Sequence, residues 1–133
     1  MNYINKDGIL ALDFGTKNVG LAISHGFMAE ALKSLNYLND KSTFIKELQK
    51  IVEEQKVGKI VIGLPLKDGE DSSQSNWTRQ QAMEISQHID LDIEFVDESY
   101  STLQAIDELS GSGDIDSQSA KIILEQYLSQ VKK

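Results

Sequence analysis

Apolar residues near the start of the chain fall into two short runs. Ile9–Phe14 and Val19–Ser24 are separated by a polar segment that contains Gly15, and this pattern predicts a hairpin of two buried strands. The spacing in Phe27–Leu38 fits either a strand or a helix, and we favour a third strand because the segment follows the hairpin directly. The chain is therefore expected to begin with an antiparallel sheet.

A helical pattern and a short buried strand follow. Apolar residues recur at helical spacing over Phe44–Val52, with charged residues between them, which predicts an amphipathic helix packed on the sheet. Ser42 is the expected N-cap of this helix, and Gly58 is its expected end. The β-branched run Lys59–Leu66 predicts a buried parallel strand that breaks at Gly63.

The second half of the chain contains further helical patterns and one more strand. One helical face is marked by Ala82, Ile85 and Ile89. The alternation in Leu91–Val96 predicts a half-exposed strand near the sheet edge. A capping-box pattern predicts a short helix over residues 101–109, followed by a flexible connection. Asp116 or Ser117 is the expected cap of a terminal helix, whose apolar face consists of Ala120, Ile123, Leu124, Tyr127 and Leu128.

This order of elements predicts an α/β fold. An antiparallel start followed by alternating strands and helices indicates one mixed five-stranded sheet, with three antiparallel strands and then two parallel ones, and helices on both faces. The length suits a single domain over residues 1–133. In such sheets, functional sites form outside the carboxyl ends of the parallel strands.

Composition narrows the classes of function. The sequence has no cysteine, which excludes disulfides and thiolate metal sites. It has no apolar run near the roughly 20 residues of a membrane span and no apolar signal region at its start, so we expect a cytoplasmic protein without membrane contact. Through Lys67, nine lysines oppose seven acidic residues, whereas from Asp68 onward three lysines and one arginine oppose fourteen. The net charge of −8 thus lies in the second half and argues against a broad basic groove for nucleic acid.

Three acidic residues stand where this fold forms a site. Asp13 and Glu98 each end a strand, and Asp116 begins the last helix. A central first strand, parallel to the two later ones, would bring Asp13 and Glu98 to one edge, where Asp116 can join them. Carboxylates suit Mg²⁺ or Mn²⁺, and two such ions can promote hydrolysis of a phosphodiester. Each acid also has a structural interpretation, namely a turn contact, a solvated strand end and a helix cap, respectively.

Four separated motifs resemble those of the YqgF/RuvX family. They are, in the family's order, Asp13–Ala22, Gly63–Leu66, Asp97–Glu98, and Asp116–Ser117 followed by the apolar face of the last helix. The family has an RNase H-like fold and includes proteins described as Holliday junction resolvases or as pre-16S rRNA nucleases. The resemblance implies a divalent-metal-dependent endonuclease that cuts structured nucleic acid in the cytoplasm, with rRNA maturation as the favoured role.

The resemblance also implies roles for the three acids and a set of partners. Asp13, Glu98 and Asp116 would be the catalytic residues and would hold Mg²⁺ or Mn²⁺, with two ions expected. The implied partners are an rRNA precursor or branched DNA, ribosomal particles, and a second copy of the chain in a homodimer.

Five further residues are candidates for substrate binding. Gly63 and Pro65 belong to the loop that, by the resemblance, would flank the substrate path. Gly15 supplies the turn after Asp13, and Lys17 in that turn is either a phosphate contact or a solvated lysine. Arg79, the single arginine, either faces substrate together with Trp77 or is solvated while the tryptophan ring packs.

Departures from the family's pattern support a second hypothesis. Family members usually carry a basic residue where this chain has Asn18 and an arginine where it has Ser99, and residues 110–114 are short and acidic here rather than long and basic. Because all three changes remove positive charge, the chain is alternatively a nucleic-acid-binding module of the same fold without turnover. A third hypothesis is phosphate transfer, because Asp-x-Gly-Thr also opens the phosphate loop of actin-like kinases. Those enzymes need two such domains around a cleft, however, which 133 residues do not supply.

Overall fold

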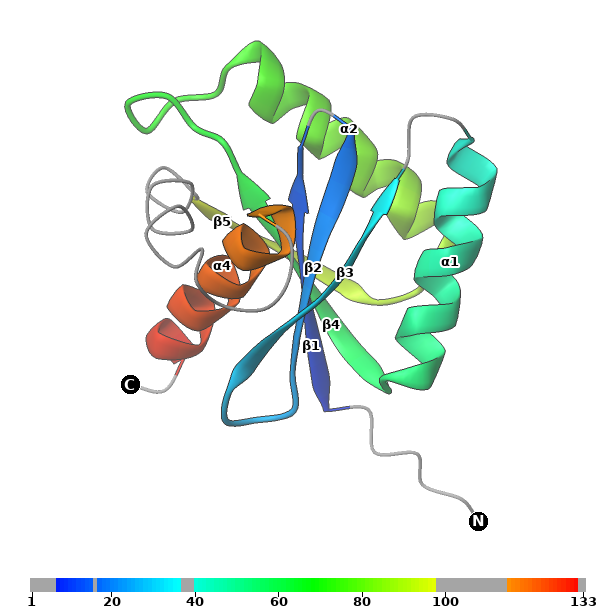
Figure 1. Cartoon of the computed structure of the whole chain (residues 1–133). Coiled ribbons are helices and arrows are strands. Elements are labelled where there is room, and N and C mark those ends of the chain that lie inside the picture. Colours follow the sequence, from blue (N-terminus) through cyan, green and yellow to red (C-terminus); the bar gives the residue numbers. More distant parts are fainter. Residues whose placement is uncertain (1–6, 16, 37–39, 98–114, 132–133) are drawn as a thin grey trace.

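Five strands form one mixed sheet (Figure 1). The computed structural model describes residues 7–15, 17–36, 40–97 and 115–131, with the backbone alone for residues 115, 116 and 131. The strands are β1 (Gly8–Phe14), β2 (Asn18–Ser24), β3 (Ala29–Asn36), β4 (Val57–Leu64) and β5 (Asp92–Asp97). Their order is β3-β2-β1-β4-β5, with the first three strands of the chain antiparallel and β4 and β5 parallel to β1. The predicted hairpin, third strand and parallel pair are all confirmed.

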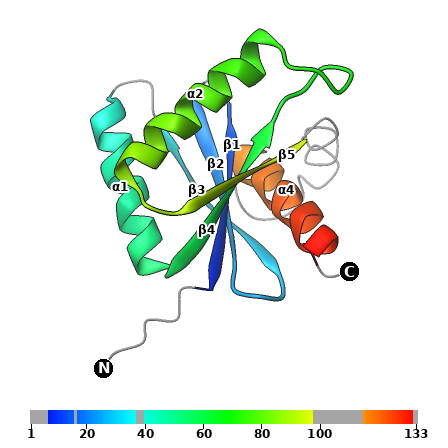
Figure 2. The same cartoon turned by 180° about the vertical axis from the view of Figure 1, so that it is seen from behind.

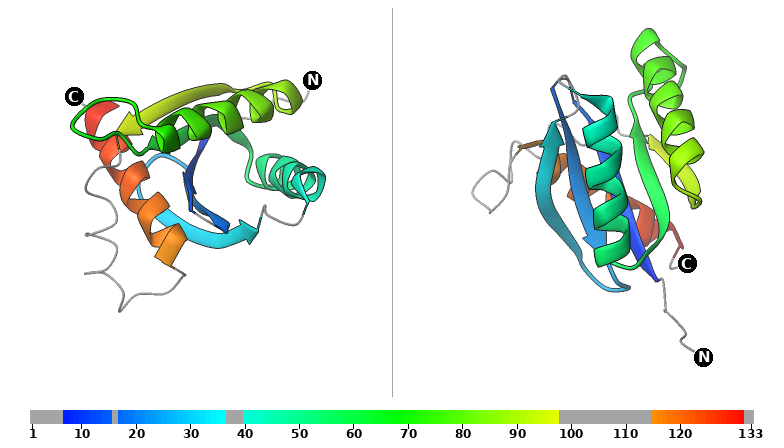
Figure 3. Two further views of the ribbon diagram at one scale, coloured as in Figure 1. Left: turned by 90° about the horizontal axis from the view of Figure 1, so that it is seen from above. Right: turned by 90° about the vertical axis from the view of Figure 1, so that its right-hand side faces the viewer.

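Helices cover both faces of this sheet (Figures 1 and 2). α1 (Lys41–Glu54) and α2 (Ser73–His88) pack on one face, and α4 (Ile115–Val131) packs on the other. Figure 3 shows the same layers from above and from the side. This arrangement confirms the predicted fold class. None of the described helices is both long and apolar enough to cross a membrane.

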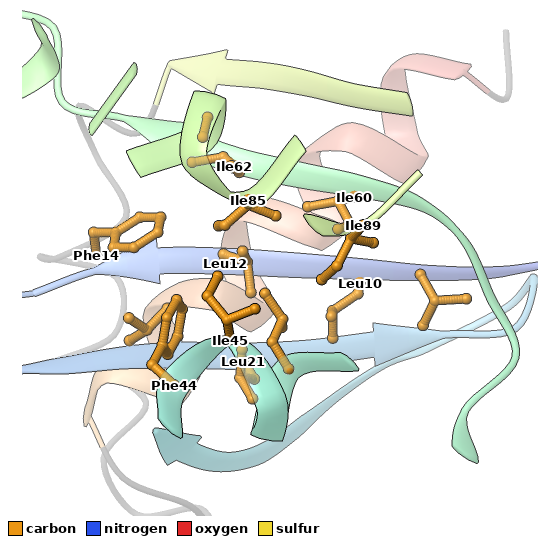
Figure 4. Close-up of a cluster of buried hydrophobic side chains, with 14 of the residues drawn as sticks. Leu10, Leu12, Phe14, Leu21, Phe44, Ile45, Ile60, Ile62, Ile85 and Ile89 are labelled. Carbon is orange, nitrogen blue, oxygen red and sulfur yellow. The ribbon is translucent and has the colours of Figure 1, made fainter. Parts of the chain in front are cut away.

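Alternation along β1 divides the core into two layers. Leu10, Leu12 and Phe14 join a cluster of buried side chains under α1 and α2 (Figure 4). The helical members of this cluster include Phe44, Ile45, Leu48, Ala82 and Ile85. Ala11 belongs instead to the cluster under α4. Because Leu10, Ala11 and Leu12 are all fully buried, β1 is covered on both faces and forms the centre of the fold.

Small side chains on the second face let α4 lie close to the sheet. Ala11, Ala22 and Val61 provide this surface from three neighbouring strands. The helix contributes Ala120, Ile123, Leu124, Tyr127 and Leu128. The apolar face predicted for the terminal helix is therefore confirmed residue by residue.

Both ends of α1 differ from the prediction. Asp40, rather than Ser42, is the N-cap, because its carboxylate accepts from the Ser42 N–H at 3.0 Å and from the Thr43 hydroxyl at 2.7 Å. The Thr43 hydroxyl also holds the pKa of Asp40 below its ordinary value. After the helix, Lys56 adopts a φ of 53° and supplies the turn that Gly58 was expected to make. Gly58 instead lies in β4.

The predicted break in β4 is also wrong. The strand continues through Gly63 to Leu64, because Gly63 stays paired with Val96 of β5. Pro65 follows the end of the strand, where its lack of an N–H costs the sheet no hydrogen bond.

The start of the terminal helix needs a similar correction. α4 begins at Ile115, so Asp116 and Ser117 lie inside its first turn and do not cap it. The predicted short helix over residues 101–109 and the connection over 110–114 lie outside the described residues.

Truncation of a buried side chain in the central strand should destabilise the protein strongly. Leu12 is fully buried, so Leu12→Ala is expected to lower the free energy of unfolding by about 2–5 kcal/mol through lost burial and the cavity left behind. Met83→Ala on the exposed side of α2 is the control and should change it by less than about 0.5 kcal/mol. Urea titrations of both variants measure the difference, and equal losses would contradict the described core.

Candidate active site

β1 carries Asp13 to the carboxyl edge of the sheet. Because Leu12 and Phe14 lie in the cluster under α1 and α2, strand alternation assigns Asp13 to the same face as Ala11, which α4 covers. Asp13 is half-buried and lies opposite Gly20 of β2. Opposite residues of an antiparallel pair share a face, so Gly20 adds no side chain beside Asp13.

A hydrogen bond joins the start of α4 to β2 close to Asp13. The Leu21 N–H donates to the hydroxyl of the fully buried Ser117 at 3.2 Å. The β2–β3 ladder shifts register between Val19 and Leu21, and the helix satisfies the Leu21 N–H at this irregularity. The bond therefore holds the first turn of α4, which contains Asp116, near the end of β1 that carries Asp13.

The parallel strands end at one edge, as predicted. Leu12, Ile62 and Phe95 form one row across β1, β4 and β5. β5 ends two residues later at Asp97, opposite the last residue of β4. Glu98, the next residue, lies outside the described residues.

One of the three predicted carboxylates is described. The side chain of Asp116 and the whole of Glu98 fall outside the described residues. Within the residues that are described, no three acidic or histidine side chains gather closely enough to hold a metal ion. Asp13 and the first turn of α4 are thus brought together, while the meeting of all three carboxylates stays a prediction.

Four predicted substrate-binding residues border the same edge. Gly15 closes the turn between β1 and β2 by donating its N–H to the carbonyl of the first residue of β2 at 2.8 Å, and Lys17 is exposed in that turn. Gly63 is buried one residue before the end of β4. The Pro65 carbonyl accepts from the Ser72 hydroxyl at 3.3 Å, which ties the loop after β4 to the start of α2. Figure 1 shows this loop extending past the sheet.

Arg79 belongs to a fixed cluster at the start of α2. Its Nε donates to Asp71 Oδ1 at 3.1 Å, and the Ser75 hydroxyl donates to the same oxygen at 2.9 Å. The Ser75 hydroxyl and, secondly, the Arg79 guanidinium hold the pKa of Asp71 below its ordinary value. The guanidinium carbon also lies 5.1 Å from the ring centroid of Phe95 on β5. The arginine is therefore neither simply solvated nor isolated.

Trp77 has a packing role on the same helix. Its ring meets Phe14 edge-on, with the centroids 5.8 Å apart and the planes at 89°. This contact covers the last residue of β1 on the α1–α2 face. The tryptophan thus takes the structural role that the sequence left open, whereas Arg79 points to β5.

A hydrogen-bond network near the C-terminal end of α4 was not predicted from the sequence. The Tyr127 hydroxyl donates to Glu94 Oε2 at 2.5 Å, and Lys59 Nζ lies 3.2 Å from the same oxygen. The Tyr127 hydroxyl and then Lys59 lower the pKa of Glu94. Lys59 Nζ also donates to the Tyr127 hydroxyl at 3.1 Å, and this bond and then Glu94 raise the pKa of Lys59. A buried tyrosine needs a hydrogen-bond partner for its hydroxyl. The position of Tyr127 on an apolar helix face was therefore the one sequence feature that pointed to such a partner.

Comparison with solved structures identifies the fold class. Thermus thermophilus RuvC in complex with a Holliday junction substrate matches with a TM-score of 0.60 and 7% identity, over 94% of this chain and 95% of that one. A second Thermus thermophilus RuvC structure matches with a TM-score of 0.52 and 7% identity, over 87% and 91%. The fold is therefore RNase H-like.

Sequence comparison identifies the family within this class. The chain belongs to the RuvX family, described as Holliday junction resolvase, whose model matches residues 7–130. A relative from Maridesulfovibrio salexigens is 42% identical over 92% of this chain and 98% of its own length. Another, from Sulfurihydrogenibium sp., is 37% identical over 92% and 90%. Both carry the name "Putative pre-16S rRNA nuclease".

The bond that holds the start of α4 can be tested by Ser117→Ala. The change leaves the buried Leu21 N–H without this acceptor, and an unsatisfied buried donor costs about 1–3 kcal/mol. Urea titration should show a loss of that size, whereas Ser129→Ala on the exposed side of the same helix should cost less than about 0.5 kcal/mol. Equal stability of the two variants would mean that the bond does not hold α4.

The hydrogen-bond network of Tyr127, Glu94 and Lys59 predicts a pH-dependent effect of Tyr127→Phe on stability. Since the folded-state pKa of Glu94 is lowered, its carboxylate stabilises the fold above the ordinary value of 4.5, and this is lost as pH falls through the lowered value. The variant should therefore be less stable than the parent at neutral pH, by at most about 1 kcal/mol because Glu94 is 48% exposed.

Urea unfolding of parent and variant at neutral pH and at about pH 3 measures this effect. The difference between the two proteins should shrink at the lower pH. A difference that stays constant with pH would show that the Tyr127 hydroxyl does not act through the Glu94 carboxylate.

Proposed function

We propose that this protein is a divalent-metal-dependent endonuclease that cuts structured RNA, with the precursor of 16S rRNA as its natural substrate. The observation that carries the proposal is the position of Asp13, half-buried at the carboxyl edge of β1 on the face where the Ser117–Leu21 bond fixes the first turn of α4. This position supports a site to which Asp13 and Asp116, from opposite ends of the chain, would both contribute.

The donor chemistry of this edge fits Mg²⁺ or Mn²⁺. Asp13, Glu98 and Asp116 are the residues proposed to hold two ions, and carboxylate oxygens are the ligands that these ions prefer. Once bound, the ions would supply Lewis-acid activation of the phosphodiester and of the attacking water. The half-buried position of Asp13 favours this use, because a carboxylate with reduced access to water gains more from a nearby cation.

Other residues would position the substrate strand at this edge. The turn between β1 and β2 follows Asp13 closely in the chain and contains the exposed Lys17. Lys17 would contact a phosphate of the substrate there. The loop that starts at Pro65 would border the path of the strand, because its tie to Ser72 keeps it against α2.

Charge favours RNA with local contacts over a four-way DNA junction. Binding of several duplex arms relies on many contacts between phosphates and lysine or arginine side chains. From Asp68 onward the chain carries three lysines and one arginine against fourteen acidic residues. The names of the relatives point the same way, although the family description and the junction-bound RuvC point to DNA.

The loss of positive charge at Asn18 and Ser99 supports one alternative function. A protein that kept the fold but bound its target too weakly for turnover would act as an RNA-binding module. It would bind precursor rRNA without cutting it, so a cleavage assay separates this alternative from the nuclease.

The nuclease function predicts a specific effect of Asp13→Asn. The amide matches the carboxylate in size but lacks its charge, so cleavage of precursor 16S rRNA with Mg²⁺ or Mn²⁺ should fall by at least about 100-fold. Asp7→Asn removes an exposed acid just before β1 and should cut like the parent protein. Circular dichroism and the thermal unfolding temperature should be nearly unchanged in both variants.

Two further measurements complete this experiment. Mn²⁺ should raise the unfolding temperature of the parent protein but not that of Asp13→Asn, because only the parent would bind the ion in the folded state. A synthetic four-way DNA junction, assayed in parallel, should be cut more slowly than the rRNA precursor. Equal cleavage by the two aspartate variants would refute the proposed site.

A further inference from the structure

An arginine and an aromatic ring lie together on the outer edge of the sheet. Phe95 is 38% exposed on β5, which has a neighbour on one side only among the described strands. The Arg79 guanidinium carbon lies 5.1 Å from the centroid of this ring, within the range of a cation–π contact. Two polarisable flat groups thus form one partly exposed surface, which we call the Arg79–Phe95 platform.

Neighbouring groups fix the orientation of this platform. Asp71 accepts from Arg79 Nε, and the Ser75 hydroxyl holds the same carboxylate oxygen. Ser75 also belongs to the capping box at the start of α2, so the anchor is part of a helix end. The arginine side chain nevertheless stays 43% exposed. A ligand that stacks on it would not need to order a flexible side chain, which lowers the entropic cost of binding.

The platform lies close to the proposed cleavage site. Phe95 shares a row with Leu12, the residue before Asp13, and two strand spacings of about 4.8 Å separate them. Phe95 alternates to the α2 face, whereas Asp13 lies on the α4 face, so a strand that crosses the carboxyl edge can reach both. A nucleotide on the platform would therefore be a few positions from the phosphate at Asp13.

Charge explains why stacking is the interaction to expect here. Asp71 and Asp97 lie beside the platform, and the second half of the chain is strongly acidic. Phosphate neutralisation can therefore contribute little binding energy on this side. Stacking of a base on arginine or an aromatic ring needs no surrounding positive charge, but it does need an unpaired base.

We propose that the Arg79–Phe95 platform binds an unpaired RNA base beside the cleavage site, so that the protein acts at unpaired segments within the structured precursor. The proposal rests on the nuclease function above, although it concerns binding and can be measured without cleavage. The competing interpretation is that the pair only attaches α2 to β5. In that case its loss would reduce stability but would not change the choice between single-stranded and duplex RNA.

Two conservative substitutions separate these interpretations. Arg79→Lys keeps the positive charge and can still pair with Asp71, but it lacks the flat surface on which a base stacks. Phe95→Leu keeps apolar cover but removes the ring. Lys41→Gln, which breaks the ion pair with Glu84, is the matched control for the first, and Phe27→Leu, an 86% exposed ring in the β2–β3 turn, is the control for the second.

Binding is measured by fluorescence anisotropy in EDTA, so that no cleavage occurs. The probes are a labelled RNA strand of about 12 nucleotides with no internal pairing and the blunt duplex that it forms with its complement. The parent protein should prefer the single strand. Each platform variant should weaken single-strand binding by about tenfold and leave duplex binding nearly unchanged, whereas the two controls should bind both probes like the parent.

The outcomes distinguish failure of this proposal from failure of the nuclease function. The stacking role would be overturned if the parent protein showed no preference for the single strand. It would also be overturned if the platform variants bound both probes like the parent, or if their binding of both probes fell equally. Selective loss of single-strand binding would support it even in a protein that cuts no RNA, in which case only the nuclease function would fail. Thermal unfolding of each variant shows whether the protein is folded in the assay.

Discussion

Burial of β1 on both faces and along both edges is the constraint on which the candidate site depends. β2 pairs with one edge and β4 with the other, and Leu10, Ala11 and Leu12 have no exposed surface. An ionised carboxylate in this stretch would lose its hydration at a cost of several kcal/mol. Asp13 follows directly, where the strand reaches the edge and the side chain is half-buried. The acid thus stands at the first half-buried position after the fully buried part of the strand.

The position of α4 depends on polar contacts as well as on its apolar face. Burial of apolar surface is non-directional and leaves a helix able to slide along small side chains such as Ala11 and Ala22. The Ser117–Leu21 bond fixes one end of α4, and the contact of Tyr127 with the edge strand fixes the other. The axial position of the helix, and with it the backbone of Asp116, is therefore determined by hydrogen bonds at both ends.

The sequence predicted most of the fold, because the strands and the helix faces are encoded by alternation over a few residues. It did not predict which of two neighbouring polar residues caps α1, since Asp40 and Ser42 are both good caps and local chemistry barely separates them. The Ser117–Leu21 bond joins residues 96 positions apart, so no local pattern reveals it. Phe95 and Val96 gave a partial signal, because consecutive apolar residues on an edge strand must face opposite sides. The motifs located Asp13 correctly at a strand end, but convergence with Glu98 depends on residues that the described fold does not include.

The two-layered core has a consequence for how the protein is synthesised. α1 and α2 precede α4 in the chain, so the first layer can form while the helix that covers Ala11, Ala22 and Val61 has not yet been made. A growing chain in this state would present a bare apolar sheet to chaperones and to other nascent chains. Arrival of residues 115–131 closes this surface and delivers Asp116 in the same event. An unfinished polypeptide would therefore expose apolar surface and lack one carboxylate of the proposed metal site, and folding of the last helix would end both conditions together.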